Sequence, residues 1–319
     1  MTGLTRAVID VGTNSVKLLV AKVEGETVIP LFEQSEQTRL GKGFYETHRL
    51  QPEAIRRTAE AIAEFSALAA TYGASGIRVF ATSAARDALN KEELLAAINE
   101  ASGLSVEIIS GEQEAEWVFR GVATHPAFQG RPLLVVDVGG GSTEFVLGSG
   151  TQKSFAQSFP LGTVRILEQI QPADPPSRGD FEHCRAWVSN FIQTRILPGI
   201  GPELRKLGQG GARLVGTGGT TTIMARIQGQ MADFDRDRID ATILTRDQVL
   251  AQLHRLWELP LGERQKIVGL PAKRADVILT GAAIFAGIME EFGFETMQVS
   301  ARGLRFAAMM ESQRKGPEQ

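Results

Sequence analysis

The chain has 319 residues, of which 43% are hydrophobic and 22% are charged, and its 34 basic and 37 acidic side chains give a formal net charge of −3. This length suggests two domains that each bury a core, and the composition excludes a disordered or collagenous chain. The balanced charge gives no overall attraction to nucleic acid or to an anionic membrane. An anionic ligand therefore needs a local basic patch or a bound metal ion.

Cysteine and histidine usage narrows the chemistry further. The single cysteine, Cys184, excludes an internal disulfide framework and a thiolate zinc cluster. The four histidines lack metal-ligand spacing; they are His48, His125, His183 and His254. The start of the chain has no signal-peptide pattern, and no apolar run approaches the roughly 20 residues of a membrane span. We expect a cytoplasmic protein with neither nucleic acid nor membrane as a partner.

The first elements predict an α/β domain that opens with a β-hairpin. An apolar run ends at Asp10, a turn of small polar residues follows, and apolar residues then alternate over 16–20. Helical spacing covers 52–72, Ile77–Ala81 is typical of a strand, and helices are predicted over 83–101 and 111–123. Strands that alternate with helices favour an α/β fold.

A second hairpin repeats the first without a gap, 127 positions later (10 to 137). Residues 135–142 match residues 8–15, so that Asp137 stands where Asp10 stood. We interpret this as an internal duplication, with the domain crossing in 124–132. Beyond it the sequence predicts a helix over 181–196, a short strand at 213–215, and a glycine-rich turn at 216–220 that leads into a helix.

Both hairpin turns are candidate phosphate-binding sites. Glycine lets the backbone approach an anion closely, and hydroxyl groups add donors. The residues concerned are Thr13, Ser15, Gly139, Gly140, Gly141, Ser142 and Thr143. Gly218 and Gly219 lie in the later glycine-rich turn, and the N-terminus of the helix that follows this turn favours an anion. The alternative is a pair of ordinary hairpins that use glycine for turn geometry alone.

Acidic residues beside these turns suggest a divalent cation. Asp10 and Asp137 repel a bare phosphate, whereas Mg²⁺ binds one or two carboxylates together with phosphate oxygens and water. Glu144 leaves the second turn in register with Lys17 of the first. We interpret Glu144 as a further metal or water ligand and Lys17 as a phosphate contact; the alternative for both is a solvated strand face.

A further carboxylate, Glu114, is a candidate general base. It lies in the first turn of a predicted helix, one turn before Val118 on the apolar stripe, while the capping-box spacing assigns Ser110 and Gln113 to the helix start. A carboxylate bordering apolar side chains loses solvation, which suits it to accept a proton from water. The alternative is an acidic residue that only complements the helix dipole.

Three basic elements supply candidate phosphate contacts. Arg86 lies one turn inside a predicted helix and could clamp a phosphate bidentately. Residues 273–276 and 302–305 carry the other basic clusters. Ordinary surface charge is the alternative for each of them.

At these residues the chain resembles the exopolyphosphatase and guanosine pentaphosphate phosphohydrolase family, within the actin, sugar-kinase and heat-shock ATPase superfold. The motifs run in order through the chain: Ile9-Asp-Val-Gly-Thr-Asn-Ser-Val-Lys-Leu18, Ala81-Thr-Ser-Ala-Ala-Arg86, Ile109-Ser-Gly-Glu-Gln-Glu-Ala115, Asp137-Val-Gly-Gly-Gly-Ser-Thr-Glu144, Gly216-Thr-Gly-Gly-Thr220, Arg274-Ala-Asp-Val-Ile278 and Gly303-Leu-Arg305. The resemblance implies two actin-like (ribonuclease H-like) domains with a cleft between them. We expect domain I to comprise 1–125 with the returning segment 300–319, and domain II to comprise 126–299.

The resemblance also implies a reaction: Mg²⁺-assisted attack of water that releases the terminal phosphate of inorganic polyphosphate or the 5′ phosphate of guanosine pentaphosphate. Glu114 falls on the family's catalytic base. Asp137 and Glu144 fall on its metal and water site, and 139–142 on its phosphate loop. The positions that match phosphate-contacting residues are Thr13, Asn14, Ser15, Lys17, Arg86 and Arg274.

Departures from the family pattern leave several functions open. Asp240-Ala241 replaces a usual His-Gly pair and Phe306 replaces an acidic residue, while Gln113 replaces a glutamate. We expect an exopolyphosphatase; the alternatives are a guanosine pentaphosphate 5′-phosphohydrolase, a non-hydrolytic regulator that binds polyphosphate or guanosine penta- or tetraphosphate, and a kinase of a small acceptor. A homodimer is a further expectation.

Overall fold

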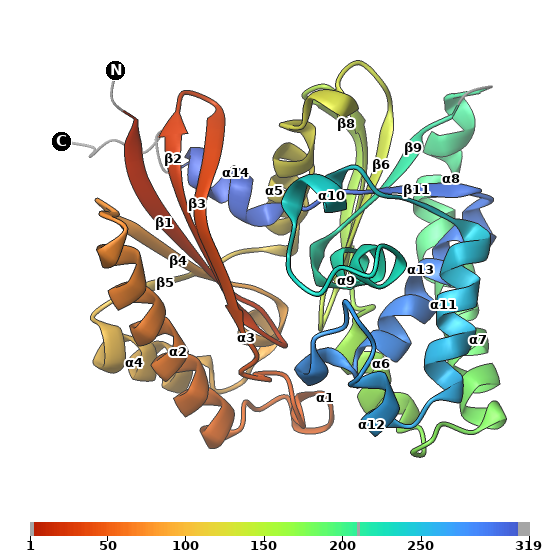
Figure 1. Cartoon of the computed structure of the whole chain (residues 1–319), viewed down its shortest axis with the longest axis horizontal. Coiled ribbons are helices and arrows are strands. Elements are labelled where there is room, and N and C mark those ends of the chain that lie inside the picture. The colour runs from red at the N-terminus through yellow and green to blue at the C-terminus, as the bar shows by residue number, and fades with distance from the viewer. Residues whose placement is uncertain (1–2, 209–210, 312–319) are drawn as a thin grey trace. The chain divides into compact units, whose positions relative to one another are not determined.

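The computed structural model describes residues 3–208 and 211–311, which fall into two compact units (Figure 1). The first unit takes the chain up to Thr124 together with the segment from Gly303 onward, and the second comprises His125–Arg302. Each unit has its own sheet and its own buried core. Residues 312–319, the last part of the predicted returning segment, lie outside the described residues.

The first unit is built on a five-stranded sheet in the order β3-β2-β1-β4-β5. Its strands are β1 (Leu4–Val11), β2 (Val16–Glu24), β3 (Thr27–Glu36), β4 (Ile77–Ala81) and β5 (Val106–Ile108). The first three strands form an antiparallel meander, and β4 and β5 run parallel to β1. The helices are α1 (Phe44–Thr47), α2 (Pro52–Thr71), α3 (Ser83–Asp87), α4 (Lys91–Ser102) and α5 (Gly111–Ala123).

The helix predicted over 83–101 is wrong as a single element, because the chain leaves helical geometry between α3 and α4. Ala88 is extended, with ψ 133°, and Asn90 follows it. The amide of Asn90 donates to the Leu50 carbonyl (3.0 Å) and accepts from the Leu50 N–H (2.8 Å). This paired contact uses Asn90 to tie two segments of the chain together, which a continuous helix would not allow.

The second unit is built on a six-stranded sheet in the order β10-β11-β9-β6-β7-β8. Its strands are β6 (Leu133–Val138), β7 (Thr143–Ser149), β8 (Gln152–Phe159), β9 (Arg213–Thr217), β10 (Ile243–Thr245) and β11 (Thr296–Val299). Its helical elements are η1 (Pro126–Phe128), α6 (Thr163–Ile170), α7 (Arg178–Phe191), η2 (Ile192–Ile196), α8 (Leu197–Lys206), α9 (Gly218–Gln228), α10 (Arg236–Asp240), α11 (Arg246–Glu258), α12 (Leu261–Arg264), η3 (Ala272–Arg274) and α13 (Ile278–Phe292). The apolar helix α13 is buried along most of its length, so it forms the centre of the helical layer.

The two units repeat one another down to the register of single residues. Asp10 lies opposite Lys17 across β1–β2, and Asp137 lies opposite Glu144 across β6–β7. In each turn the N–H of the first glycine donates to a serine carbonyl, from Gly12 at 3.1 Å and from Gly139 at 2.9 Å. The following strand pair has a register shift in both units, at Val20/Ala21 and at Leu147/Gly148, again 127 positions apart (20 to 147).

The C-terminal helix α14 (Leu304–Glu311) packs on α5 and on β1 of the first unit. A Cβ on Gly121 of α5 would overlap the Gly303 carbonyl, so glycine lets the two backbones meet. At the far end Glu311 pairs with Arg120 (3.4 Å) and Arg78 (3.6 Å). The first unit is therefore assembled from the beginning and the end of the chain.

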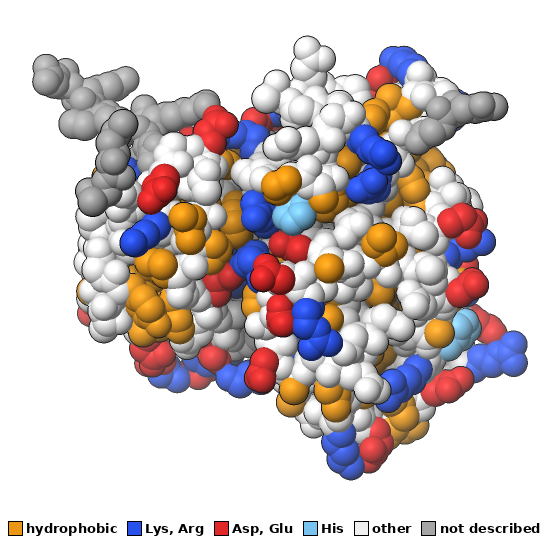
Figure 2. Space-filling model, turned by 45° about the horizontal axis from the view of Figure 1, so that its top comes forward, with side chains coloured by type: hydrophobic (Ala, Val, Ile, Leu, Met, Phe, Trp, Pro, Cys, Tyr) orange, Lys and Arg blue, Asp and Glu red, His pale blue; other side chains and the backbone are white. Residues whose placement is uncertain are grey.

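Charge and hydropathy over the surface agree with the composition. Acidic and basic side chains are interspersed on the face drawn in Figure 2, with no large field of one sign. Within the part of the chain that the structure describes, no helix has both the length and the hydropathy that a bilayer span requires.

Candidate active site

In the second unit, Asp137 and Glu144 form a pair of carboxylates on one face of the sheet. They are direct partners across the antiparallel strands β6 and β7, so their side chains leave the sheet on the same side. Glu144 is 2% exposed and accepts a hydrogen bond from the Ser158 hydroxyl (2.7 Å). Two carboxylates in this arrangement are a donor set that Mg²⁺ uses together with phosphate oxygens and water.

The glycine turn beside this pair is held in place by α6. The N–H groups of Thr163 and Val164 donate to the carbonyls of Gly139 and Gly140, at 3.0 and 2.9 Å. A Cβ on Gly162 would overlap the Gly140 carbonyl, so the helix start and the turn are in backbone contact. The first N–H groups of α6 are therefore used to fix the turn.

The hydroxyl groups of this turn have different surroundings. Thr143 is fully buried, and its hydroxyl donates to the Leu161 carbonyl. That hydrogen is already used within the protein. Ser142 is buried at the end of the turn, where its carbonyl accepts a hydrogen bond from the Gly139 N–H (2.9 Å). Thr143 and Ser142 were both predicted to donate a hydroxyl to phosphate. The Thr143 hydroxyl instead donates to the protein backbone.

The second glycine-rich turn also reaches Asp137. Strand β9 runs parallel to β6, and Thr217 is the register partner of Asp137, so both strands end at the same edge of the sheet. Gly218 has a φ of +84°, and a Cβ there would overlap Asp137 Oδ1. Only glycine fits this position, for both reasons. The N-terminus of α9 therefore lies directly against the carboxylate.

Arg274 completes the group in the second unit. A Cβ on Gly219 would lie 2.8 Å from Arg274 Nη2, which places the guanidinium against the backbone of the turn. Burial lowers the pKa of the Arg274 guanidinium to about 10, and Asp276 opposes that change. The group still carries its charge at neutral pH. Two acids, two glycine turns and one arginine are thus gathered at one sheet edge.

In the first unit the turn 13–15 is almost completely buried. Thr13 Oγ1 accepts a hydrogen bond from the Ala84 N–H (3.3 Å), which joins the turn to the start of α3. Asn14 is 6% exposed, and its amide Nδ2 has no hydrogen-bond partner among the residues that the structure describes. A buried amide donor is normally satisfied, so an acceptor at this position would complete the site.

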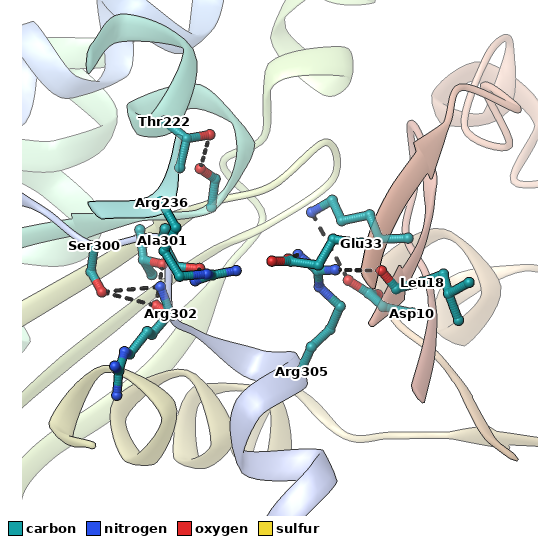
Figure 3. Close-up of polar contacts among 12 residues, drawn as sticks. Asp10, Leu18, Glu33, Thr222, Arg236, Ser300, Ala301, Arg302 and Arg305 are labelled. Atoms are coloured by element: carbon teal, nitrogen blue, oxygen red, sulfur yellow. Dashed lines mark hydrogen bonds and ion pairs between the residues drawn. The ribbon is translucent and has the colours of Figure 1, made fainter. Parts of the chain in front are cut away.

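Asp10 lies beneath this turn and has cations of the protein beside it (Figure 3). Its Oδ2 is 3.9 Å from Lys17 Nζ. Arg305 of α14 donates to the Leu18 carbonyl (2.9 Å) and pairs with Glu33 (3.1 Å). Burial raises the pKa of the Asp10 carboxyl, while Lys17 and Arg305 act in the opposite direction. The motif that contains Arg305 was visible in the sequence, but its contacts were not.

Glu114 and Arg86, which the sequence assigned to separate roles, form an ion pair. Glu114 is 6% exposed, and its Oε2 accepts from Arg86 Nη1 at 3.0 Å. The same nitrogen donates to the Ile109 carbonyl (3.1 Å). Ser110 caps α5 by accepting from the Gln113 N–H (3.1 Å), which is one of the two hydrogen bonds of the predicted capping box. The N-cap thus fixes the helix turn that carries Glu114.

Parallel strands explain why these residues of the first unit meet. Strand β1 is parallel to β4, and β4 is parallel to β5, so their carboxyl ends share one sheet edge. The turn 13–15, helix α3 with Arg86, and helix α5 with Glu114 all begin there. Ligands in open α/β sheets bind beyond this edge.

Two of the three departures from the family pattern, at Asp240 and at Phe306, have structural contacts. Asp240 Oδ1 accepts from the Ala301 N–H (2.5 Å), and Arg236 donates to the Ala301 carbonyl (2.9 Å), so both fix the segment before α14 (Figure 3). Phe306 is 1% exposed and belongs to the buried face of α14. These side chains therefore hold the returning segment.

The acidic residues that the structure describes form no cluster of three or more possible metal ligands. Over the described ranges, no group of three or more His, Cys, Asp or Glu side chains is placed to hold a metal ion. Asp137 and Glu144 are a pair of carboxylates that the sequence predicts as metal ligands.

The fold and the site define an α/β protein of two-domain actin-like architecture, and its motifs match known phosphatases. The chain matches the Ppx/GppA phosphatase family over residues 19–314, and it belongs to this family. Exopolyphosphatase 2 of Mycobacterium tuberculosis is 33% identical over 313 residues, which cover 93% of this chain and 95% of that protein. The bifunctional 3-dehydroquinate synthase/phosphatase of Fusobacterium nucleatum is 31% identical and matches 96% of this chain but 46% of its own length.

Solved structures agree with this assignment. A Ppx/GppA family member of Aquifex aeolicus has a TM-score of 0.76 at 30% identity and covers 99% of both chains. An exopolyphosphatase-like protein has a TM-score of 0.88 at 28% identity and covers 98% of this chain and 99% of its own. The two-domain actin-like fold that the sequence predicted is confirmed by these neighbours.

Proposed function

We propose that the protein is an exopolyphosphatase that hydrolyses the terminal phosphate of inorganic polyphosphate. The observation that carries this proposal is the group around Asp137, where two carboxylates, two glycine turns and Arg274 share one sheet edge. Such a group fits a phosphate chain accompanied by a divalent cation. The relatives named exopolyphosphatase support polyphosphate as the substrate.

In the proposed reaction, water attacks the terminal phosphorus and the bond to the bridging oxygen breaks. The products are inorganic phosphate and a chain one phosphate shorter. We assign the water proton to Glu114, whose burial and fixed helix turn suit a general base. The ion pair with Arg86 orients the Glu114 carboxylate. We therefore assign Arg86 the role of positioning Glu114. A contact of Arg86 with phosphate stays a prediction.

The proposal gives the phosphate contacts to the turns and to nearby cations. In the second unit these are the backbone of Gly139–Gly141, Ser142, the start of α9 at Gly218 and Gly219, and Arg274. In the first unit they are Thr13, Asn14, Ser15 and Lys17. The buried amide of Asn14 supports this set, since a phosphate oxygen would satisfy its donor.

We propose that Asp137 and Glu144 hold Mg²⁺ when the substrate binds. The cation supplies charge neutralisation for the phosphate oxygens and for the leaving group. Asp10 is left out of this pair, because Lys17 and Arg305 already offset its charge. Glu144 is oriented by the Ser158 hydroxyl, which holds one of its oxygens.

Phosphate release from long-chain polyphosphate, measured with Mg²⁺ and with a chelator, tests the function. We expect release only with the metal, and a fall in kcat of about 10²–10⁴-fold in Glu114→Gln. Glu112→Gln is the matched control, because Glu112 is exposed in the first turn of the same helix. We expect it to keep wild-type activity. Absence of phosphate release with Mg²⁺ present contradicts the proposal.

The same assay separates the alternatives. A higher kcat/KM for guanosine pentaphosphate than for polyphosphate would make the nucleotide the main substrate. If the wild-type protein binds polyphosphate but does not hydrolyse it, the protein would be a non-hydrolytic regulator. Transfer of phosphate from ATP to a small acceptor would indicate a kinase.

A further inference from the structure

A short loop after β3 lies directly on the phosphate-binding turn of the first unit. The Gly41 N–H donates to the Thr13 carbonyl (2.7 Å), and the Arg39 N–H donates to the Asn14 carbonyl (3.0 Å). A Cβ on Gly41 would overlap Thr13 Cγ2, so the loop backbone and the turn are in contact. We call Arg39–Gly43 the clamp loop.

The clamp loop is held in one conformation. Leu40 and Phe44 are fully buried on either side of Gly41. Arg39 has a φ of +52°, which an arginine adopts only where the surrounding structure imposes it. The Lys42 N–H donates to the Arg39 carbonyl (3.0 Å) and closes the loop. The backbone at residue 42 is therefore fixed beside the turn.

Lys42 is the exposed cation of this loop. It follows the glycine that contacts Thr13 and precedes Gly43, whose φ is +69°. Among the described residues its side chain makes no ion pair. Its ammonium stands on a flexible four-carbon stem with three donors, which suits contact with a mobile polyanion.

We propose that the clamp loop determines chain-length preference, with Gly41 fixing the turn that holds the terminal phosphate and Lys42 contacting phosphates further along the chain. This inference rests on the proposed function, because it needs a polyphosphate end at Thr13–Ser15. A substrate that continues beyond the turn carries further negative charges, and an exposed cation beside the turn attracts them. A short substrate ends before that contact.

Equilibrium binding without Mg²⁺ tests Lys42, with long-chain polyphosphate and tripolyphosphate as probes. We expect Lys42→Gln to weaken binding of the long chain about threefold to fivefold, as for an exposed ion pair. Tripolyphosphate binding should change less than twofold. The plot of the logarithm of the long-chain binding constant against the logarithm of salt concentration should become less steep, as expected for the loss of about one cation–phosphate contact.

The matched control is Lys22→Gln. Lys22 is another exposed lysine of the first unit, but it lies toward the end of β2 remote from the turn. We expect no difference from wild type with either probe. Equal weakening by both variants, or equal weakening of both probes by Lys42→Gln, overturns the proposal.

Gly41→Ala tests the contact with the turn. The added methyl displaces Thr13, so binding of both probes should weaken, whereas Gly76→Ala should not change it, because a Cβ at Gly76 meets nothing within 4 Å. Wild-type binding by a folded Gly41→Ala protein overturns this part. Since binding is measured apart from turnover, a chain that binds but does not hydrolyse polyphosphate contradicts the proposed function alone.

Discussion

Burial destabilises the charged carboxylate of Asp10, and neighbouring cations partly compensate for this. Asp10 is 6% exposed at the end of the first strand, where burial opposes its charged form. Lys17 and Arg305 reduce that cost, and they reach Asp10 from two parts of the chain that are far apart in sequence. Glu114 has a comparable arrangement with Arg86. Both of these buried carboxylates of the first unit therefore have a cation beside them.

Asp10→Asn should stabilise the protein at neutral pH. Burial raises the pKa of the folded carboxyl above its unfolded value, so the folded state binds more protons between the two values. The free energy of unfolding therefore falls as the pH rises through that interval, and the asparagine avoids this loss. We expect the variant's advantage in urea unfolding to be present at pH 7 and to shrink as the pH is lowered toward the unfolded value.

A control of opposite sign is Asp180→Asn. Asp180 accepts hydrogen bonds from Ser177, which lower its pKa. The contribution of Asp180 to the free energy of unfolding is fully present above the pKa of the unfolded carboxyl. It is lost as the pH falls through the lower pKa of the folded carboxyl. This variant should be less stable than wild type at pH 7. If the difference in free energy of unfolding between Asp10→Asn and wild type does not change with pH, the raised pKa of Asp10 is contradicted.

At the scale of elements, close backbone contacts decide which pieces of the chain meet. Helix α14 reaches α5 because Gly121 and Gly303 have no side chains between them, and Arg305 then reaches the β1–β2 hairpin. Nothing in the helical periodicity of 111–123 marks Gly121 as a contact. The break between α3 and α4 was also missed, since Asn90 acts on Leu50 from 40 positions away.

Gly121→Ala should lower the free energy of unfolding, by up to about 2 kcal/mol. A methyl group there overlaps the Gly303 carbonyl, and overpacking costs about 1–3 kcal/mol. The gain in helix propensity of about 1 kcal/mol offsets only part of that cost. Urea unfolding measures the difference. Gly262 is an exposed position of α12 where an added Cβ meets nothing within 4 Å, so Gly262→Ala should match or slightly exceed the stability of wild type. Equal stability of the two variants would count against the contact.

At the scale of the whole molecule, two cores are built from unequal stretches of chain. The second unit is continuous from His125 to Arg302, whereas the first needs the segment from Gly303 onward. The buried residues Phe306, Ala307 and Met309 belong to that segment. Without it, the first unit would expose the apolar surface that α14 covers.

Expression of the two pieces tests this asymmetry. A fragment of residues 125–302 should fold alone and unfold cooperatively in urea. A fragment of residues 1–124 should not, because it lacks α14 and the partners of Arg78 and Arg120. Circular dichroism and urea unfolding of both fragments measure the outcome. A cooperative transition in the 1–124 fragment would mean that α14 is dispensable for that core.

The sequence by itself determined the architecture and the residue types of the site. The gapless repeat of 8–15 at 135–142 predicted two related units. The structure shows the same pairing in both hairpins, with Asp10 opposite Lys17 and Asp137 opposite Glu144. The alternating pattern of a strand and the periodicity of a helix are local properties of the sequence. Strands and helices can therefore be predicted without knowledge of distant contacts.

Only the tertiary structure decided which of those residues share a site. Parallel strands β4 and β5 bring Arg86 to Glu114, and β6 with β9 brings Gly218 to Asp137. The clamp loop on Thr13 and the contact of Arg305 with Leu18 likewise join segments that no local pattern connects. The physical reason is that such contacts depend on how strand ends and backbones pack, and periodicity along one segment carries no information about its distant neighbours.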